Sequence, residues 1–275
     1  MIKRRKASFA LNLGGVMLRN AFRYIFIVIS LAIILGCGGP KEYKVWSDGY
    51  LNKGMMVTDA KGDLQKDGKW VRMTQDNRVV SETEYKIGKR EGVTVNYRPN
   101  GNKLNETQYA NDKKNGVYKE WNAKQELIKE ATYKDDKLNG AYLEKREDGE
   151  HKGFYKDEKK DGEWSHTWPS GAKSIATYKE GKMDGPWKKL FKDGTVAEIG
   201  QYKNDKPVGE WKSWFTPKQM WWTGSYDDEG KFHGKKTIWY EDGKTQEICV
   251  YEHGKEMELK EWDKNGKLTN DAKRR

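Results

Sequence analysis

A glycine that recurs at nearly constant intervals is the feature that most constrains this 275-residue chain. Its spacings are 22 to 25 residues, and it occurs at Gly68, Gly92, Gly116, Gly140, Gly162, Gly185, Gly209 and Gly234. A series of tyrosines keeps the same phase, at Tyr85, Tyr109, Tyr133, Tyr155, Tyr178, Tyr202, Tyr226 and Tyr251. Two independent series in step predict a tandem array of about eight repeats over residues 61–269.

Each unit of this array is expected to form a β-hairpin. An aromatic residue stands two positions after the glycine in most units, and a second stands six positions after it at Trp168, Phe191, Phe215 and Tyr240. Even spacing places both on one face of a strand. Asn-Gly and Asp-Gly pairs in mid-unit, as at Gly101 and Gly194, are typical of hairpin turns. No helical apolar stripe is present, so we expect an all-β fold, an elongated single-layer antiparallel meander.

The composition supports a thin β-structure. Apolar and charged residues each make up 35% of the chain, a balance that is common in disordered proteins. The 12 tryptophans and 15 tyrosines argue against disorder, and the 29 glycines suit frequent turns.

The repeats resemble the MORN repeat in its bacterial variant form. Residues 178–187 read Tyr-Lys-Glu-Gly-Lys-Met-Asp-Gly-Pro-Trp, and residues 155–164 carry the same pattern. The units at Gly68 and at Gly234, where Lys236 replaces the aromatic residue, depart from it and suit capping units. Many bacterial relatives are described as YwqK-like antitoxins, which implies toxin neutralisation by binding. Eukaryotic relatives imply membrane attachment and scaffolding.

The N-terminus has the pattern of an export signal. Residues 24–35 are apolar and follow Arg19 and Arg23, but they are fewer than the about 20 residues of a spanning helix. The following Gly36 and Cys37 complete a segment that resembles the lipobox of bacterial lipoproteins, which implies acylation of Cys37 and a membrane anchor. An uncleaved membrane anchor is the alternative. Translation starts at Met1 or, for a signal of ordinary length, at Met17.

These patterns divide the chain into four parts. We expect a lipoprotein signal peptide, as a helix, over residues 1–36, and the lipidated cysteine, a tether and an N-terminal cap over 37–60. The repeat array covers 61–269, and a basic tail covers 270–275. Because Gly38 rather than Asp follows the cysteine, resemblance to enterobacterial sorting implies export to the outer membrane or cell surface.

The net charge of +11 belongs largely to the signal segment. Six basic residues and no acidic residue lie in residues 1–36, which leaves 47 basic against 42 acidic residues in the rest. These charges alternate, as on a solvated surface, whereas a nucleic-acid site would need a concentrated basic face. We therefore expect no nucleic-acid partner.

The sequence offers no catalytic constellation, and we expect no enzyme activity, no cofactor and no metal site. The four histidines, His151, His166, His233 and His253, lack metal-ligand spacing, and no nucleophile elbow, P-loop or dinucleotide fingerprint occurs. Cys249 stands in an apolar segment, so we expect a small buried hydrophobe, with an intermolecular disulfide as the alternative.

Tryptophans are in surplus in the seventh unit. Trp211, Trp214, Trp221 and Trp222 exceed what the repeat requires, and neighbours of opposite parity cannot share one face. They are either a stacking layer of the sheet or a platform that binds a ligand. We predict a binding surface there, in an anchored protein-interaction or scaffolding module. The alternatives are a toxin-neutralising immunity or antitoxin-like protein, and a glycan or peptidoglycan binder.

Overall fold

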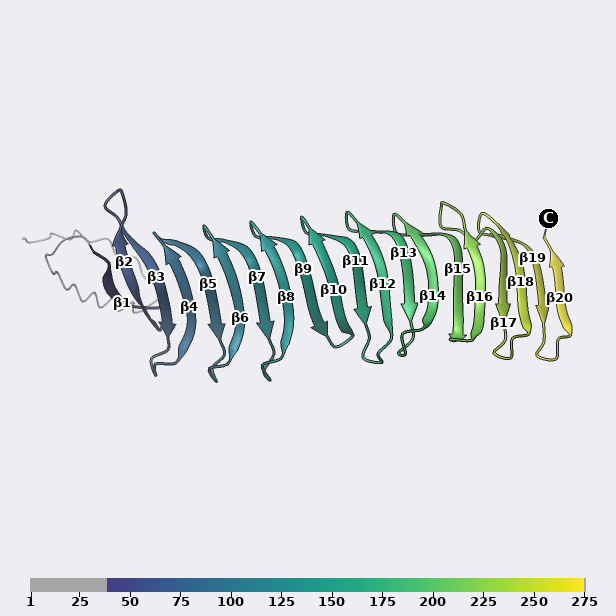
Figure 1. Cartoon of the computed structure of the whole chain (residues 1–275), viewed down its shortest axis with the longest axis horizontal. Coiled ribbons are helices and arrows are strands. Elements are labelled where there is room, and N and C mark those ends of the chain that lie inside the picture. Colours follow the sequence, from purple (N-terminus) through teal and green to yellow (C-terminus); the bar gives the residue numbers. More distant parts are fainter. Residues whose placement is uncertain (1–38, 275) are drawn as a thin grey trace, which may run out of the picture.

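The computed structural model describes residues 39–274 and contains strands and turns, with no helix in that range. Its twenty strands form one open sheet, in which each strand pairs antiparallel with the next along the chain (Figure 1). The prediction of an all-β antiparallel meander is therefore confirmed. The expected signal helix and Cys37 lie outside the described residues.

The first ten strands are β1 (Lys41–Ser47), β2 (Tyr50–Thr58), β3 (Leu64–Met73), β4 (Val79–Lys86), β5 (Lys89–Tyr97), β6 (Lys103–Ala110), β7 (Lys113–Trp121), β8 (Leu127–Lys134), β9 (Lys137–Arg146) and β10 (Gly149–Lys156). The last ten are β11 (Lys159–Thr167), β12 (Lys173–Lys179), β13 (Lys182–Leu190), β14 (Val196–Lys203), β15 (Lys206–Thr216), β16 (Gln219–Tyr226), β17 (Gly234–Trp239), β18 (Thr245–Glu252), β19 (Lys255–Trp262) and β20 (Leu268–Lys273).

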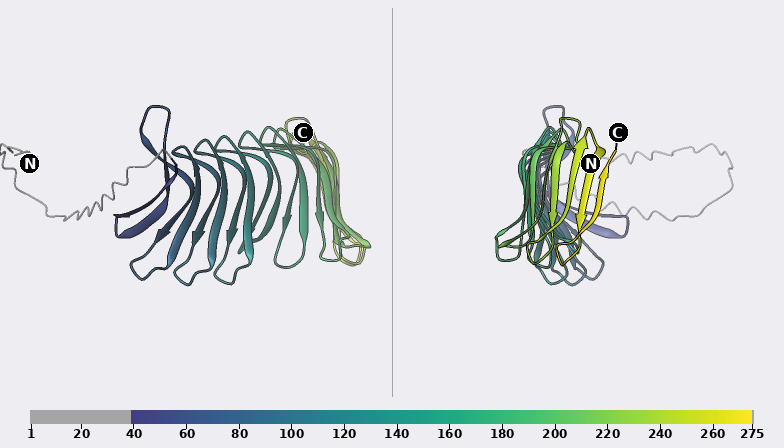
Figure 2. Two further views of the ribbon diagram at one scale, coloured as in Figure 1. Left: turned by 60° about the vertical axis from the view of Figure 1, so that its left-hand side comes forward. Right: turned by 90° about the vertical axis from the view of Figure 1, so that its right-hand side faces the viewer.

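The sheet is long across its strands and one layer thick. The strands lie side by side in chain order, with the turns in two rows along the long edges (Figure 1). Figure 2 shows that the strands are bent. Strands β1 and β2 lie in the segment 37–60 that the sequence assigns to a tether and cap, and β20 reaches into residues 270–275. Backbone pairing thus extends the sheet to hairpins that lack the glycine-aromatic motif.

Two-residue turns recur in the Lys-x-x-Lys segments, whereas most of the mid-unit Asn-Gly and Asp-Gly pairs lie in wider turns. Asp135 and Asp136 alone connect β8 to β9, with φ values of 48° and 68°. Two consecutive positive φ angles match the right-handed twist of a hairpin, and Asp tolerates them better than most residues. Gly101 (φ 84°) lies instead in a wider turn, which the N–H of Arg98 closes on the Asn102 carbonyl at 2.8 Å.

The tight turns also connect hairpins. The Asp136 carboxylate accepts the backbone N–H of Lys114 at 2.8 Å, and the Asp136 N–H donates to the Lys114 carbonyl at 2.9 Å. Equivalent bonds join Asp112 to Arg90 and Asp205 to Met183. Each such turn therefore forms hydrogen bonds with the strand that precedes the hairpin it closes.

The register explains both sequence series. The recurring glycines oppose the recurring tyrosines, as in Gly116↔Tyr133, and aromatic residues oppose small ones, as in Tyr118↔Ala131 and Trp164↔Ala176. Opposed residues share a face of the sheet. We call this side, which carries the tyrosines and the aromatic residues two positions after each glycine, the aromatic face. It holds the core, including the buried Trp70, Ala131, Tyr142, Trp164, Ala176 and Trp211.

Candidate interaction surface

Rings on the aromatic face pack on one another from strand to strand. Trp164 is 5% exposed, and its ring lies 5.7 Å from that of Tyr142 and 5.0 Å from that of Tyr155. Trp211 is 4% exposed and lies 5.2 Å from Trp187 and 5.3 Å from Tyr202. Trp211, one of the four predicted binding residues, is therefore part of the packed layer.

Small residues make room for these rings. A Cβ atom added to Gly153 would overlap the Trp164 ring, and one added to Gly200 would overlap the Trp211 ring. Both glycines lie within strands and neither has a positive φ, so their role is steric. The indole Nε1 of Trp164 then donates to the Phe154 carbonyl at 2.9 Å, which anchors the ring over the strand before it.

The other three predicted tryptophans differ in position. Trp222 is the register partner of Ser213 on the aromatic face, and Phe232 packs against it with ring centroids 6.2 Å apart. Trp214 is the partner of Met220, one position further along β15, and so turns to the opposite face. Trp221 has no partner in the ladder, because the register shifts there.

A second shift lies only one pair away from the first. Trp221 is the extra residue of β16, and Phe215 is the extra residue of β15, on either side of the Trp214↔Met220 pair. Bulges of this kind re-aim side chains and are frequent next to functional sites. Here the two skipped residues meet, with ring centroids 5.7 Å apart, and Trp221 is 45% exposed.

An open cleft adjoins this pair at the edge of the sheet. Phe191, Lys192 and Asp193 in the turn after β13 form one side of the cleft, and Phe215, Thr216 and Pro217 form the other. We call Phe191, Phe215, Pro217 and Trp221 the edge patch. It is the part of the predicted tryptophan-rich region in which rings remain accessible to a partner.

The unit with Lys236 is completed from a neighbouring turn. Phe232 precedes β17, and its ring stacks on Tyr226 at 4.2 Å and lies 5.3 Å from Tyr251. The Lys236 ammonium lies 4.9 Å from the centre of the Phe232 ring. The aromatic layer therefore continues through this unit, although its strand lacks the expected aromatic residue.

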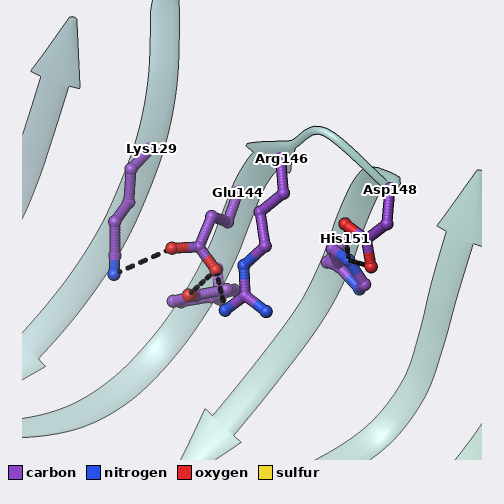
Figure 3. A network of polar contacts seen from close by, with 6 residues as sticks. Lys129, Glu144, Arg146, Asp148 and His151 are labelled. Carbon is purple, nitrogen blue, oxygen red and sulfur yellow. Dashed lines mark hydrogen bonds and ion pairs between the residues drawn. The ribbon is translucent and has the colours of Figure 1, made fainter. Parts of the chain in front are cut away.

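A polar row runs beside the rings on the aromatic face (Figure 3). Glu144 on β9 receives Lys129 at 3.2 Å, the Tyr142 hydroxyl at 2.7 Å and the Arg146 guanidinium. Partial burial would raise the pKa of Glu144, but these donors outweigh it and hold the pKa below its ordinary value. The carboxylate thus stays ionised and fixes the tyrosine hydroxyl.

Sequence reasoning missed that the histidines lie in pairs. The structure gathers His151 and His166 with Asp148, and His233 and His253 with Asp227. Partners lie 15 and 20 positions apart, distances set by hairpin length rather than by a short motif. Register was the signal that could have found the first pair, because His151 and His166 oppose each other on β10 and β11.

Cys249 is buried, as predicted, with 1% of its surface exposed. Burial, reinforced by a hydrogen bond to Glu247, raises the pKa of its thiol to about 11. A thiol held in its neutral form is a poor nucleophile, so Cys249 acts as a packing residue.

Comparison with known proteins gives no family assignment. No protein-family model matches the sequence, and no curated protein matches it. The resemblances to MORN repeats and to bacterial lipoproteins therefore stay predictions. Within residues 39–274 no helix has the length and apolar character needed to cross a bilayer.

Proposed function

We propose that this protein is a non-enzymatic, lipid-anchored envelope protein whose repeat array binds a partner protein and serves as a scaffold. The proposal includes eight MORN-like repeats, a signal helix before them, acylation of Cys37 and residence at the outer membrane or cell surface. The exposed Trp221, which packs on the half-buried Phe215 at the double bulge, is the observation that carries it.

The edge patch has the chemistry of a protein contact. Tryptophan is enriched among the residues that dominate binding energy at interfaces, and such residues insert into apolar pockets of the partner. The ring of Trp221 is already fixed against Phe215, so little side-chain entropy is lost on binding. The open cleft beside Phe215 offers a matching recess for an apolar side chain of the partner.

Trp221 lies apart from the residues whose packing stabilises the sheet, so its role in binding can be tested without unfolding the protein. The residues that hold the sheet together, such as Trp164 and Trp211, are 4–5% exposed, whereas Trp221 is skipped by the strand ladder and 45% exposed. An exposed ring that adjoins an apolar cleft, as Trp221 does through Phe215, is the kind of contiguous patch that marks an interaction site.

The test is a pull-down from envelope extract with the full-length protein in mild detergent. Trp221→Ala should abolish capture of the specific partner, whereas Trp46→Ala, which removes an equally exposed ring (46%) on β1, should not. Cys37→Ser should release the protein from the membrane fraction and leave the Trp221-dependent capture intact.

Other results would overturn the proposal. Capture that is identical for Trp221→Ala and the wild-type protein would remove the edge patch from the interface. Sedimentation with purified peptidoglycan in place of protein capture would make the protein a glycan binder. A captured toxin whose activity the protein suppresses would assign the antitoxin-like function instead.

A further inference from the structure

The histidines point to a ligand that the proposed function does not include. All four histidines of the chain lie in groups of two with one aspartate, and the three candidate ligand atoms of each group lie within 4.8 Å of one another. We propose that the first of these groups, Asp148, His151 and His166, binds a divalent transition-metal ion. This site is independent of the edge patch.

The backbone places the two imidazoles together. His151 on β10 and His166 on β11 are direct register partners, and opposed residues in antiparallel strands have Cβ atoms about 4.5–5.5 Å apart. Their rings stack with centroids 4.3 Å apart and planes inclined by 19°. Both rings are partly buried, and Trp168 packs against His166 at 4.4 Å. The rings are thus held side by side before any ion arrives.

The carboxylate comes from the turn that leads into β10 (Figure 3). Both carboxylate oxygens of Asp148 lie 3.3 Å from Nε2 of His151. Zinc–ligand bonds of about 2.0–2.1 Å place two ligands of a tetrahedral ion roughly 3.3–3.4 Å apart. The Asp148–His151 pair already has this separation. The His166 ring would have to turn out of the stack and release the Asp148 carbonyl oxygen to complete a three-ligand site.

The turn that carries Asp148 lies close against β11. Gly149 has a φ of 132°, and a Cβ atom there would overlap the Thr167 carbonyl oxygen and lie 3.0 Å from Nε2 of His166. The same His166 nitrogen lies 3.0 Å from the Asp148 carbonyl oxygen.

The donor set selects the class of ion. Imidazole nitrogens suit zinc, copper and nickel, whereas calcium and magnesium prefer sites made of oxygen ligands. Three protein ligands leave at least one position for water or for a group from another molecule. Asp148 is exposed, which opens the site to solvent and gives the ion an entry path.

The second group provides a matched comparison within the same chain. Asp227 Oδ1 accepts the backbone N–H groups of Glu229 and Lys231, and Nδ1 of His233 accepts the N–H of His253 at 3.4 Å. Both histidines of this group are exposed, and they lie in turns rather than on paired strands. Ligand atoms of both groups take part in hydrogen bonds, but only the imidazoles of the first group are partly buried and lie on paired strands, so we expect the first group to bind more tightly.

The experiment is calorimetric titration of the full-length protein in detergent with Zn²⁺ and with Ni²⁺, and with Mg²⁺ as the negative control. The tighter site should be lost in His166→Asn and in Asp148→Asn, with affinity lowered roughly 10–100-fold or more. His233→Asn should leave that site unchanged. Acidification should release the ion, because imidazole ligates only in its neutral form.

A spectroscopic measurement keeps the test independent of small changes in folding. Electron paramagnetic resonance of bound Cu²⁺ should show coupling to two imidazole nitrogens in the wild-type protein and to one in His166→Asn. The proposal is wrong if the wild-type protein binds these ions no more tightly than on the order of 1 mM. It is also wrong if His233→Asn removes the tighter site while His166→Asn retains it.

Discussion

The two ends of the sheet shield equivalent aromatic rings from water with different side chains, which we call the covers of the rings. In β3–β8 the position two residues before each recurring glycine holds a cation, and each cation lies over a ring. Lys66 lies 4.6 Å from the Trp70 ring centre, Arg90 lies 4.0 Å from that of Tyr109, and Lys114 lies 5.0 Å from that of Tyr133. Toward the C-terminus the same position holds Met183 on β13, Pro207 on β15 and Phe232 in the turn before β17.

Contacts between rings replace these cations toward the C-terminus. Trp187, Trp211 and Tyr202 pack together, and Phe232 stacks on Tyr226. A sheet of one layer has no second layer to exclude water from its rings, so neighbouring side chains must do so. Either a lysine stem whose charge stays in water or a second aromatic ring can therefore shield a ring of the sheet from solvent.

The N-terminal and C-terminal units also differ at the edge of the sheet that carries the wide turns. The residue six positions after the glycine is Thr74, Arg98 or Asn122 in the first three units, but Phe191, Phe215 or Tyr240 toward the C-terminus. The edge patch is therefore the exposed end of a more apolar half, in which rings extend beyond what the core requires.

Replacement of single glycines under the rings should give the largest stability effect. Gly200→Ala places a methyl group into the Trp211 ring, which Trp187 and Tyr202 hold in place, and should cost about 1–3 kcal/mol of unfolding free energy. Gly54→Ala places its Cβ 2.6 Å from Trp70, whose cover is the flexible Lys66, and should cost less. Urea denaturation followed by tryptophan fluorescence measures both.

Gly224 is the control for this series. It also lies in a strand of the aromatic face, but the nearest atom to an added Cβ is Cγ of Lys236 at 3.3 Å, in a side chain that can move. Gly224→Ala should be neutral or stabilising, because alanine reduces the entropy of the unfolded chain. Equal losses at Gly54, Gly200 and Gly224 would contradict the idea that rigidity differs between the two halves.

The repeating part of this structure could be predicted from the sequence because the same cross-strand contacts recur in each hairpin. Pairs such as Gly116↔Tyr133 recur along the sheet, so one correct hairpin predicts the others. The sequence could not show which residues the ladder skips. Phe215 and Trp221 look like ordinary strand residues until the register shifts, and Phe232 looks like a turn residue until its ring is seen between Tyr226 and Tyr251.

The histidine groups were hidden for a related reason. Short metal motifs are visible when ligands follow one another on a single element, whereas His151 and His166 lie on two strands and Asp148 lies in a turn. The distance between them depends on the register of one hairpin. A shift by one residue would send one ring to the other face and destroy the group.

Alkaline pH should separate the two modes of cover. Burial raises the pKa of Tyr202 above 10.0, so the folded state holds this proton more tightly, and its stabilisation is lost as pH rises above that value. Burial lowers the pKa of Lys66 below 10.5, so the unfolded state binds more protons there, and stability rises as pH increases toward 10.5.

Single substitutions can measure these opposite slopes. Tyr202→Phe should flatten the loss of stability above pH 10, and Lys66→Met should remove the gain below 10.5, in urea titrations between pH 8 and pH 11. Each effect should stay well under about 1.4 kcal/mol per pH unit, because both groups are partly exposed and screened by water. A slope that neither variant changes would place the pH dependence elsewhere.

An exchange of the covers should have the smallest effect and is the most direct test of their equivalence. Lys66→Met removes a cation–π contact worth about 0.5–1 kcal/mol but also removes the cost of partly burying an ammonium group. Met183→Lys introduces a lysine at the position that Lys160 occupies in an earlier hairpin, where its ammonium lies 4.4 Å from the Trp164 ring centre.

Both substitutions should therefore change the unfolding free energy by less than about 1 kcal/mol, measured by urea denaturation at pH 7. Met183→Ala is the control, because it removes the cover without replacing it and should cost more than either exchange. A loss above about 2 kcal/mol for Met183→Lys alone would mean that the C-terminal rings exclude a cation. The rings beneath would then determine which side chain can cover them. The C-terminal half would be a specialised apolar surface, and its covers could not be exchanged for those of the N-terminal half.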